Sequence, residues 1–220
     1  MAYARTGLRE QVYEKLKGEI ATLQLAPGVM VSENDLAGRF GVSRMPVHDA
    51  LMTLSKNHLV DIYPQRGSQV SLIDLKLVDE ARFIRQTLET VVTISLFDTI
   101  TPQQMQQLEQ SVQRQRLYLQ NQQLEDFSRE DNLFHRLIYM FAEREETLRI
   151  VSDIMTHFDR MRVMTLRVNF GRNLVEEHDG LVRAIREKDA EAVKVLVARH
   201  LTDYRENLEE IRGSYSSYFK

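Results

Sequence analysis

Four residues in the second half of the chain combine residue types and spacing that could bind a metal ion. Asp131 and His135 are four residues apart, so a helix would present both side chains on the same face. His178 and His200 follow, on what the apolar spacing predicts to be two further helices. Carboxylate and neutral imidazole together suit zinc, nickel or another first-row divalent metal. Taken alone, however, Asp-x-x-x-His is more typical of an ion pair on a helix surface.

The composition excludes several other kinds of chemistry. The 220 residues are 43% hydrophobic and 28% charged, which suits one or two domains with a buried core. Because there is no cysteine, disulfides, cysteine-based zinc sites and cysteine nucleophiles are excluded. No stretch approaches the roughly 20 apolar residues of a membrane span, and the N-terminus lacks the features of a signal peptide. We therefore expect a cytoplasmic protein that does not enter the membrane.

Proline and glycine concentrate in the first 70 residues and divide them into short elements. Apolar spacing predicts a helix over 8–23, and the capping-box pattern that begins at Ser32 predicts a second, short helix. Gly41 ends that helix, and Ser43 is placed to cap another. Residues 59–71 alternate like two strands joined by a tight turn. This order of elements predicts a winged helix-turn-helix.

A winged helix-turn-helix domain, which we assign to residues 1–71, predicts which side chains meet DNA. The second helix of such a pair enters the major groove with its N-terminal residues at the base edges. The residues placed there are Ser43, Arg44, Met45, Val47 and His48. Arg44 is the best candidate for sequence readout because a guanidinium can pair with guanine O6 and N7, and a phosphate contact is the alternative.

The motifs of this domain resemble those of a known family. The runs that carry the resemblance, within residues 8–71, are Ser32-Glu33-x-x-Leu36-Ala37, Gly41-Val42-Ser43-Arg44-x-Pro46-Val47, Ala50-Leu51, Leu59-Val60 and Arg66-Gly67. Their order and spacing are similar to those of the DNA-binding domain of GntR-type bacterial regulators. The resemblance implies that Asn34 contacts DNA and that Arg66 and Gly67 form the wing tip. The chain departs from the family at His48-Asp49, where Arg-Glu is usual, and at His58, where glycine is common.

From residue 76 onward, apolar positions recur at helical spacing with few prolines and glycines. We expect six helices and no strand in residues 76–215, the last three over about 146–168, 173–187 and 190–211. Asp189 is placed to cap the last of them. The predicted fold class is mainly α, with an N-terminal winged helix-turn-helix followed by an all-helical bundle.

The second half also resembles a known domain, over roughly residues 76–211. Asp131-x-x-Phe134-His135, Glu177-His178 and His200 look like the FCD ligand-binding domain of the FadR-type branch of GntR regulators. That resemblance implies that Asp131, His135, His178 and His200 hold a divalent transition metal, with zinc or nickel expected. It also implies an effector contact for Arg85, for which an interhelical salt bridge is the alternative.

One histidine and one pair of neighbouring residues lie outside the family's metal pattern. His157 sits beside the apolar face of the predicted 146–168 helix, and we expect it to pack with its polar edge satisfied rather than to line a cavity. Arg144-Glu145 stands where the family often has Gly-Asn, which we expect to change a helix end and not the metal site.

Together these features predict a DNA-binding transcriptional regulator and not an enzyme. We expect a homodimer that binds palindromic double-stranded DNA as a repressor and responds to a small carboxylate metabolite bound at the metal. Activation is the open alternative for the response. The formal net charge of −3, divided as +1 in residues 1–70 and −4 in the rest, adds nothing in favour of DNA binding, so the motifs carry that prediction.

Two rival functions remain open from sequence. Three histidines and a carboxylate could hold a metal that activates water in a metal-dependent enzyme, although no general base stands beside the pattern. Alternatively, the metal could stabilise a regulator that has no small-molecule effector.

Overall fold

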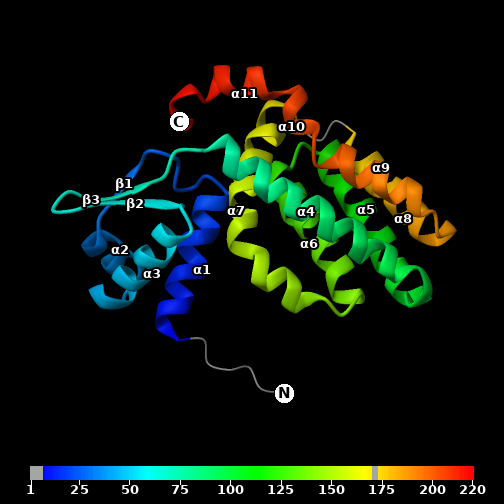
Figure 1. Cartoon of the computed structure of the whole chain (residues 1–220), viewed down its shortest axis with the longest axis horizontal. Helices are drawn as coiled ribbons and strands as arrows, with labels where there is room; N and C mark the ends of the chain where they lie inside the picture. The colour runs from blue at the N-terminus through cyan, green and yellow to red at the C-terminus, as the bar shows by residue number, and fades with distance from the viewer. Residues whose placement is uncertain (1–6, 170–172) are drawn as a thin grey trace.

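The computed structural model describes residues 7–169 and 173–220, in which the buried apolar side chains form two separate cores. One core belongs to the N-terminal part and the other to the helical part that follows. In Figure 1 the long helix α7 (Glu145–Val168) lies between the N-terminal elements and the remaining helices of the bundle. The first six residues of the predicted N-terminal domain lie outside the described residues.

The N-terminal part has the helices and the hairpin that the sequence predicts. Its elements are α1 (Leu8–Ala21), β1 (Met30–Val31), α2 (Glu33–Phe40), α3 (Arg44–Lys56), β2 (Val60–Tyr63) and β3 (Gly67–Val70). The strands form one antiparallel sheet in the order β1-β3-β2, in which Val60 pairs with Val70 and Tyr63 with Gly67. Strand β1 was not predicted, because two residues are too few to give an alternating pattern.

Local capping explains where α2 and α3 begin and end. The Ser32 hydroxyl accepts a hydrogen bond from the Asp35 backbone N–H at 3.4 Å, and α2 ends at Gly41, whose φ of 66° is in the left-handed region that favours glycine. Ser43 occupies the N-cap position of α3, as predicted, but its side chain makes no capping hydrogen bond to a described residue. The Ser43 side chain therefore takes no part in the cap.

The helical part consists of α-helices and two short 3-10 turns over the described residues. Its α-helices are α4 (Leu75–Ser95), α5 (Pro102–Gln120), α6 (Leu124–Phe141), α7, α8 (Leu174–Glu187), α9 (Ala190–His200), α10 (Asp203–Glu206) and α11 (Leu208–Ser214). Asp189 caps α9 by accepting hydrogen bonds from the backbone N–H groups of Glu191 and Ala192, as predicted. The predicted mainly α fold class is confirmed.

The prediction of one continuous helix over 190–211 is wrong, because α9 ends at His200. The Thr202 hydroxyl bonds to the backbone carbonyls of Ala198 and Arg199, which offers the chain a local alternative to helical hydrogen bonding. The break therefore makes His200 the last residue of its helix.

The end of the chain returns to the junction between the two parts. Ile73 donates its backbone N–H to the carbonyl of Tyr218 and accepts from the N–H of Lys220, at 2.7 and 3.1 Å. The segment that follows β3 is thus joined to β3 at its start and hydrogen-bonded through Ile73 to the C-terminal residues (Figure 1). No helix in the described ranges has the length and apolar character needed to cross a bilayer.

Candidate metal centre and DNA-reading surface

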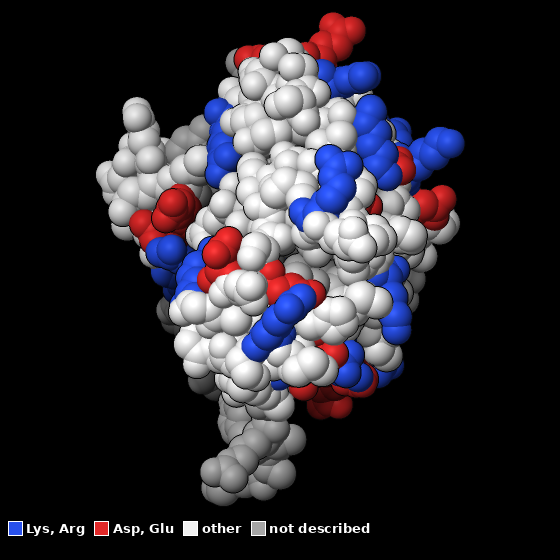
Figure 2. Space-filling view, turned by 90° about the vertical axis from the view of Figure 1, so that its left-hand side faces the viewer, with Lys and Arg blue, Asp and Glu red and all other residues white. Residues whose placement is uncertain are grey.

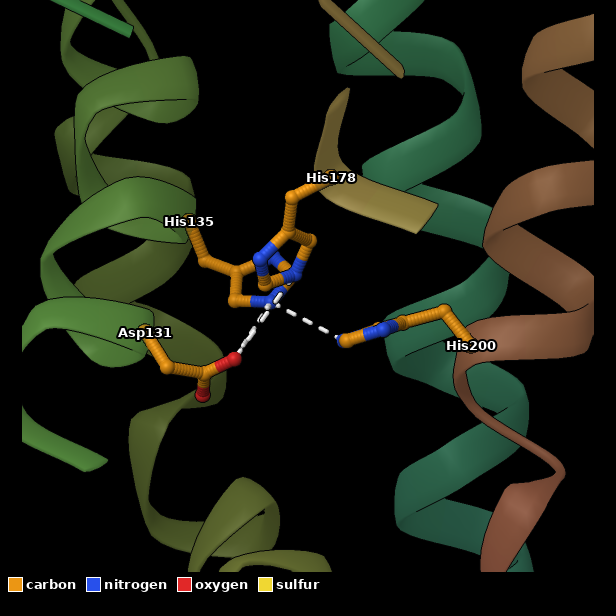
Figure 3. A group of neighbouring side chains, drawn as sticks. All are labelled: Asp131, His135, His178 and His200. Atoms are coloured by element: carbon orange, nitrogen blue, oxygen red, sulfur yellow. Dashed lines mark hydrogen bonds and ion pairs between the residues drawn. The ribbon is translucent and has the colours of Figure 1, made fainter. Parts of the chain in front are cut away.

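Folding brings the four predicted metal ligands to one buried point. Asp131 and His135 project from α6, His178 from α8 and His200 from the end of α9, and the four side chains point toward one another (Figure 3). One candidate ligand atom from each residue lies within 4.8 Å of all the others, and all four residues are buried.

On the side away from this point, Nδ1 of each histidine ring faces a carboxylate or amide oxygen, by a hydrogen bond in His178 and His200 and by an ion-pair contact outside hydrogen-bond geometry in His135. Nδ1 lies 3.0 Å from a Glu89 carboxylate oxygen in His135, 2.7 Å from the Gln115 amide oxygen in His178 and 3.2 Å from a Glu177 carboxylate oxygen in His200. Because these partners accept, we assign the proton to Nδ1 in all three rings, which leaves the Nε2 lone pairs facing the centre.

Several polar atoms at the centre carry no proton, so they can only accept hydrogen bonds. The Nε2 atoms of His135 and His200 are 3.1 Å apart, and in the assigned tautomer both are acceptors. Nε2 of His178 and Oδ1 of Asp131 are buried without a hydrogen-bond partner among the described residues, 3.6 Å from each other. Three imidazole nitrogens and one carboxylate oxygen that converge in this way fit a divalent transition metal.

Burial and a nearby positive charge keep His135 and His178 neutral and Asp131 ionised, which are the protonation states that a metal needs. Burial lowers the pKa of His135, and it lowers the pKa of His178 well below its ordinary value, so both rings are neutral. Burial alone would raise the pKa of Asp131, but the positive charge of Arg162 opposes it, and the pKa lies well below its usual range. Arg162 approaches the outer oxygen of Asp131 at 2.7 Å, which leaves the inner oxygen for a metal.

Arg85 lies beside this centre but does not contact the four ligands. Its Nε donates to Glu89 at 2.7 Å, one turn along the same helix, and its terminal nitrogen is 3.8 Å from Asp159 on α7. Arg85 is thus held mainly by an intrahelical pair, with a longer interhelical contact. Glu89 contacts both Arg85 and His135, so it connects the arginine to the ligand set.

Sequence reasoning assigned no role to the residues that orient the rings. Glu177 stands within a motif of the FCD resemblance and Glu89 lies one turn after Arg85, so their positions could have indicated a supporting role. Gln115 gave no signal, because it is one of many glutamines along α5 and only the fold shows which of them faces His178. Arg162 was left unassigned, since a basic residue on a long helix is ordinary.

Of the predicted DNA-binding residues, all but one are exposed. The exposed residues are Asn34 on α2, Ser43, Arg44, Met45 and His48 at the start of α3, and Arg66 and Gly67 at the hairpin. The prediction for Val47 is wrong, because its side chain is fully buried. Val47 shares one face of α3 with Ala50, Leu51 and Leu54, so its helical position directs it into the N-terminal core.

Glu33 connects the two polar side chains at the start of α3. It forms an ion pair with Arg44, and its other oxygen lies 2.8 Å from Nδ1 of His48. The hydrogen bond to His48, followed by that to Arg44, lowers the pKa of Glu33. The glutamate therefore holds Arg44 and His48 next to each other on the exposed end of the helix.

The surface of the N-terminal side has no continuous basic area among the residues drawn in colour. Figure 2 shows lysine and arginine separated by acidic side chains and by wide neutral regions. Residues 1–70 carry a net charge of only +1, and their surface has no continuous basic area either. We therefore expect a small number of lysine and arginine side chains to make the DNA contacts.

The comparisons with known proteins identify both parts of the chain. Residues 8–70 match the family described as bacterial regulatory proteins, gntR family, and residues 80–203, more than half of the chain, match the FCD domain. The chain belongs to the GntR family.

Relatives and solved structures agree with this membership over nearly the full chain. The HTH-type transcriptional repressor RspR of Escherichia coli (strain K12) is 33% identical over 213 residues, which cover 96% of this chain and 93% of RspR. The gluconate operon transcriptional repressor of Bacillus subtilis (strain 168) is 23% identical over 217 residues, which cover 96% and 88%. Among solved structures, E. coli McbR/YncC matches 95% of this chain and 99% of its own with a TM-score of 0.79 at 21% identity, which shows a shared fold.

These relatives are transcriptional regulators, so this GntR protein is a DNA-binding regulator and not an enzyme, as predicted.

The remaining residues that the sequence singled out behave as structural groups. His58 is exposed at the end of α3 with a φ of 58°, which explains why glycine suits that position in the family. Arg144 is the N-cap residue of α7 and Glu145 its first residue, so the pair lies at a helix end.

In this GntR regulator, His157 packs with both ring nitrogens satisfied, as expected. Its Nε2 lies 2.9 Å from the backbone carbonyl of Asn57, and its Nδ1 accepts from Arg160 at 3.0 Å. Arg160 is fully buried and also donates to the backbone carbonyl of Ser71 at 2.8 Å. Helix α7 thereby contacts the end of the predicted recognition helix and the segment after the hairpin.

Proposed function

We propose that this GntR regulator is a homodimeric repressor whose binding to a palindromic operator is controlled by a carboxylate metabolite at a metal ion. The observation that carries the proposal is the convergence of Asp131 Oδ1 and three histidine Nε2 atoms on one buried point. The repressor names of two relatives support the mode of regulation.

DNA recognition rests on the exposed start of α3, which would enter the major groove. Arg44 is the residue that we propose to read a guanine, and Glu33 positions its guanidinium from the side. Asn34, Ser43, Met45 and His48 would lie at the same groove, and Arg66 and Gly67 at the hairpin would contact the adjacent backbone or minor groove.

The metal would be zinc or nickel, held by Asp131, His135, His178 and His200. Four protein ligands leave coordination positions open on a five- or six-coordinate ion, and the metal would supply an attachment point for a carboxylate oxygen. The buried guanidinium of Arg85 lies near the same centre, and its N–H groups that do not bond to Glu89 would be the ones to donate to an anionic effector. One relative is named for the gluconate operon, and gluconate is itself a carboxylate.

Helix α7 supports a route from the effector to DNA. Its Arg162 contacts the metal ligand Asp131, while its Asp153 contacts Lys17 and Asn57 of the N-terminal part at 3.0 and 2.9 Å. A change at the centre that moves α7 would therefore change the placement of the DNA-binding part. Effector and operator must then affect each other's affinity reciprocally.

The proposal is tested by operator binding of the full chain, first stripped of metal and then restored with zinc. A panel of carboxylates and uncharged analogues is added, and fluorescence anisotropy follows release of labelled operator. We expect at least one carboxylate to release the operator only from the zinc-restored protein. Release by carboxylates at the same concentration with and without metal would contradict a metal-bound effector.

A metal with a structural role alone is the second candidate, because the four ligands link α6, α8 and α9. It predicts that zinc stabilises the protein while no carboxylate changes operator affinity. The same titration separates the two functions.

A further inference from the structure

One carboxylate connects two polar side chains at the exposed start of α3. Glu33, the first residue of α2, has one oxygen 2.8 Å from Nδ1 of His48 and accepts from Nε of Arg44 with the other. The Glu33 side chain is 21% exposed, whereas those of Arg44 and His48 are 68% and 47% exposed. The carboxylate is therefore more covered than its two partners, and both partners remain open to DNA that meets this surface.

Glu33 stays ionised, and this fixes the position of the proton on the His48 ring. The hydrogen bond to His48, followed by that to Arg44, lowers the pKa of Glu33. An ionised carboxylate only accepts hydrogen bonds, so Nδ1 carries the proton in the neutral ring and Nε2 carries a lone pair. Nε2 has no hydrogen-bond partner among the described residues. The neutral ring thus offers DNA only an acceptor, and phosphate oxygens are acceptors too.

The charge of these three side chains decides how they meet phosphate. With a neutral imidazole, the negative charge of Glu33 cancels the positive charge of Arg44. With an imidazolium, the group carries one net positive charge, and Nε2–H can donate to a phosphate oxygen. Residues 1–70 carry a net charge of only +1, so one added positive charge is a large change for this part of the chain.

His48 is the histidine that lies on the predicted DNA-reading surface. Histidine is the side chain whose charge ordinarily changes between about pH 5 and pH 8. Four of the six histidines are buried, and the other exposed one, His58, follows the far end of α3. Of the elements that pack against α3, α2 contributes Glu33, while α1 and β2 contribute no ion pair or hydrogen bond to His48 among the described residues. On α3 itself, the nearby charge is Arg44, which shares Glu33 with His48.

We propose that His48 binds a DNA phosphate as an imidazolium held in place by Glu33, so that each half-site takes up one proton from the solvent when DNA binds. The inference rests on the proposed function, because it requires the start of α3 to lie in the major groove. Phosphate contacts Nε2–H, while Glu33 fixes the Nδ1 side of the ring. Proton and phosphate then favour each other's binding, so DNA affinity falls as the pH rises.

Anisotropy titrations of the full chain test this proposal, with an operator isolated by selection from random duplexes and a scrambled duplex, at about pH 6 and about pH 8. We expect the parent to bind operator about tenfold more weakly per half-site at the higher pH, because one charge-assisted hydrogen bond is lost. The slope of log affinity against log salt should become shallower by roughly one unit per half-site. The scrambled duplex should show the same change in slope, because a phosphate contact carries no sequence information.

Two substitutions at one position separate the charge of His48 from its shape. His48→Gln cannot gain a proton, so at both pH values it should bind operator as the parent does at the higher pH. His48→Arg is always charged, so at both pH values it should bind as the parent does at the lower pH. His58→Gln is the matched control and should keep the parental pH dependence. All these variants carry the same metal centre, so any effect of pH on a metal cancels in the comparison.

Glu33→Gln tests the positioning role of the carboxylate. It keeps the shape of the side chain but removes the negative charge that favours the imidazolium, so the fall in operator affinity should move to lower pH. A fall at the same pH as in the parent would contradict this role of Glu33.

An operator affinity that stays constant or rises with pH, or an equal pH dependence in His48→Gln, would overturn the proton-dependent contact. A pH effect confined to operator would mean a base contact and would overturn the phosphate contact. Arg44→Ala separates this inference from the proposed function. If Arg44→Ala loses the preference for operator while pH has no effect on the parent, only this inference fails. If Arg44→Ala keeps that preference, the proposed reading of DNA by Arg44 fails, whatever the pH dependence.

Discussion

At the scale of single residues, the two arginines of the DNA-binding part are expected to act differently. Arg44 lies at the start of α3, where we expect a base edge, whereas Arg66 lies at the hairpin, where we expect a phosphate contact. Arg44→Ala should therefore reduce the preference for operator over unrelated DNA by about 1–3 kcal/mol. Arg66→Ala should weaken both DNAs alike and reduce the salt dependence of binding.

Anisotropy titrations with operator and scrambled duplexes at several salt concentrations measure both effects. If Arg44→Ala keeps the full preference for operator over scrambled DNA, Arg44 is not the residue that reads the operator sequence.

The unpartnered hydroxyl of Tyr139 makes a prediction about stability. Tyr139→Phe removes a buried donor that has no partner among the described residues, so the free energy of unfolding of the metal-free protein should stay constant or rise by up to about 1 kcal/mol. Tyr13→Phe is the control, because the Tyr13 hydroxyl accepts from Asn57 at 2.9 Å. That variant should lose about 1 kcal/mol in urea unfolding. A loss of that size in Tyr139→Phe would mean that its hydroxyl is satisfied in the free protein.

Spacing alone placed Asp131 beside His135, and the FCD resemblance added His178 and His200, but neither predicted what surrounds the four residues. Asp131 and His135 lie on one helix face, so their proximity follows from sequence. The approach of His178 and His200, and the choice of Gln115 among its neighbours, depend on how α5, α8 and α9 pack. Val47 was misplaced because its position near the start of the recognition helix was given more weight than its apolar character.

At the scale of elements, α7 is the helix that connects the two parts, and Asp153 tests that connection. It pairs with Lys17 and accepts from Asn57, so Asp153→Asn should weaken the link while leaving the metal centre intact. We expect unchanged zinc affinity and a smaller loss of operator affinity when a carboxylate effector binds. Glu146→Gln is the control on the same helix, since Glu146 pairs with exposed Arg149 one turn away. Equal effector responses in both variants would rule out a route through Asp153.

His157 makes the contact between α7 and α3 sensitive to acid. Burial, and then the nearby Arg160, lower the pKa of His157 from 6.5 to about 4. The unfolded chain therefore takes up this proton at a higher pH than the folded protein does. The resulting stability is present above about pH 6.5 and is lost as the pH falls toward 4.

Between pH 7 and pH 5 this loss should be on the order of 2 kcal/mol, and His157→Gln should remove it from the pH dependence of unfolding. Urea unfolding of the metal-free proteins at the two pH values measures the difference, with His58→Gln as the control for an exposed histidine. An unchanged pH dependence in His157→Gln would mean that this ring is not held neutral by its surroundings.

Element boundaries followed from sequence wherever a cap or a periodic pattern marks them. Ser32 and Gly41 delimit α2, and Asp189 begins α9, each by a side-chain or backbone conformation that the residue type favours. The end of α9 could not be predicted in this way. The bonds of Thr202 to preceding carbonyls compete with a helix that apolar spacing alone would continue.

At the scale of the whole molecule, the metal is expected to act as a cross-link between helices that are distant in sequence. The ligands come from α6, α8 and α9, and the same bundle packs against the DNA-binding part through α7. A ligand that binds only the folded protein stabilises it by RT ln(1 + [L]/Kd), about 2.7 kcal/mol at a hundredfold excess over Kd. For a chain of this size, that corresponds to a rise of roughly 5–10 °C in melting temperature.

The most direct test of the account is the shift in melting temperature that zinc causes in the parent protein and in His178→Ala. We predict that zinc raises the melting temperature of the parent, that a chelator reverses the rise, and that His178→Ala responds to neither. His157→Ala is the control, because this histidine is buried but lies outside the ligand set, so its response to zinc should persist. A parent protein that ignores both zinc and chelator, or a His178→Ala variant that gains as much stability from zinc as the parent does, would contradict the metal centre.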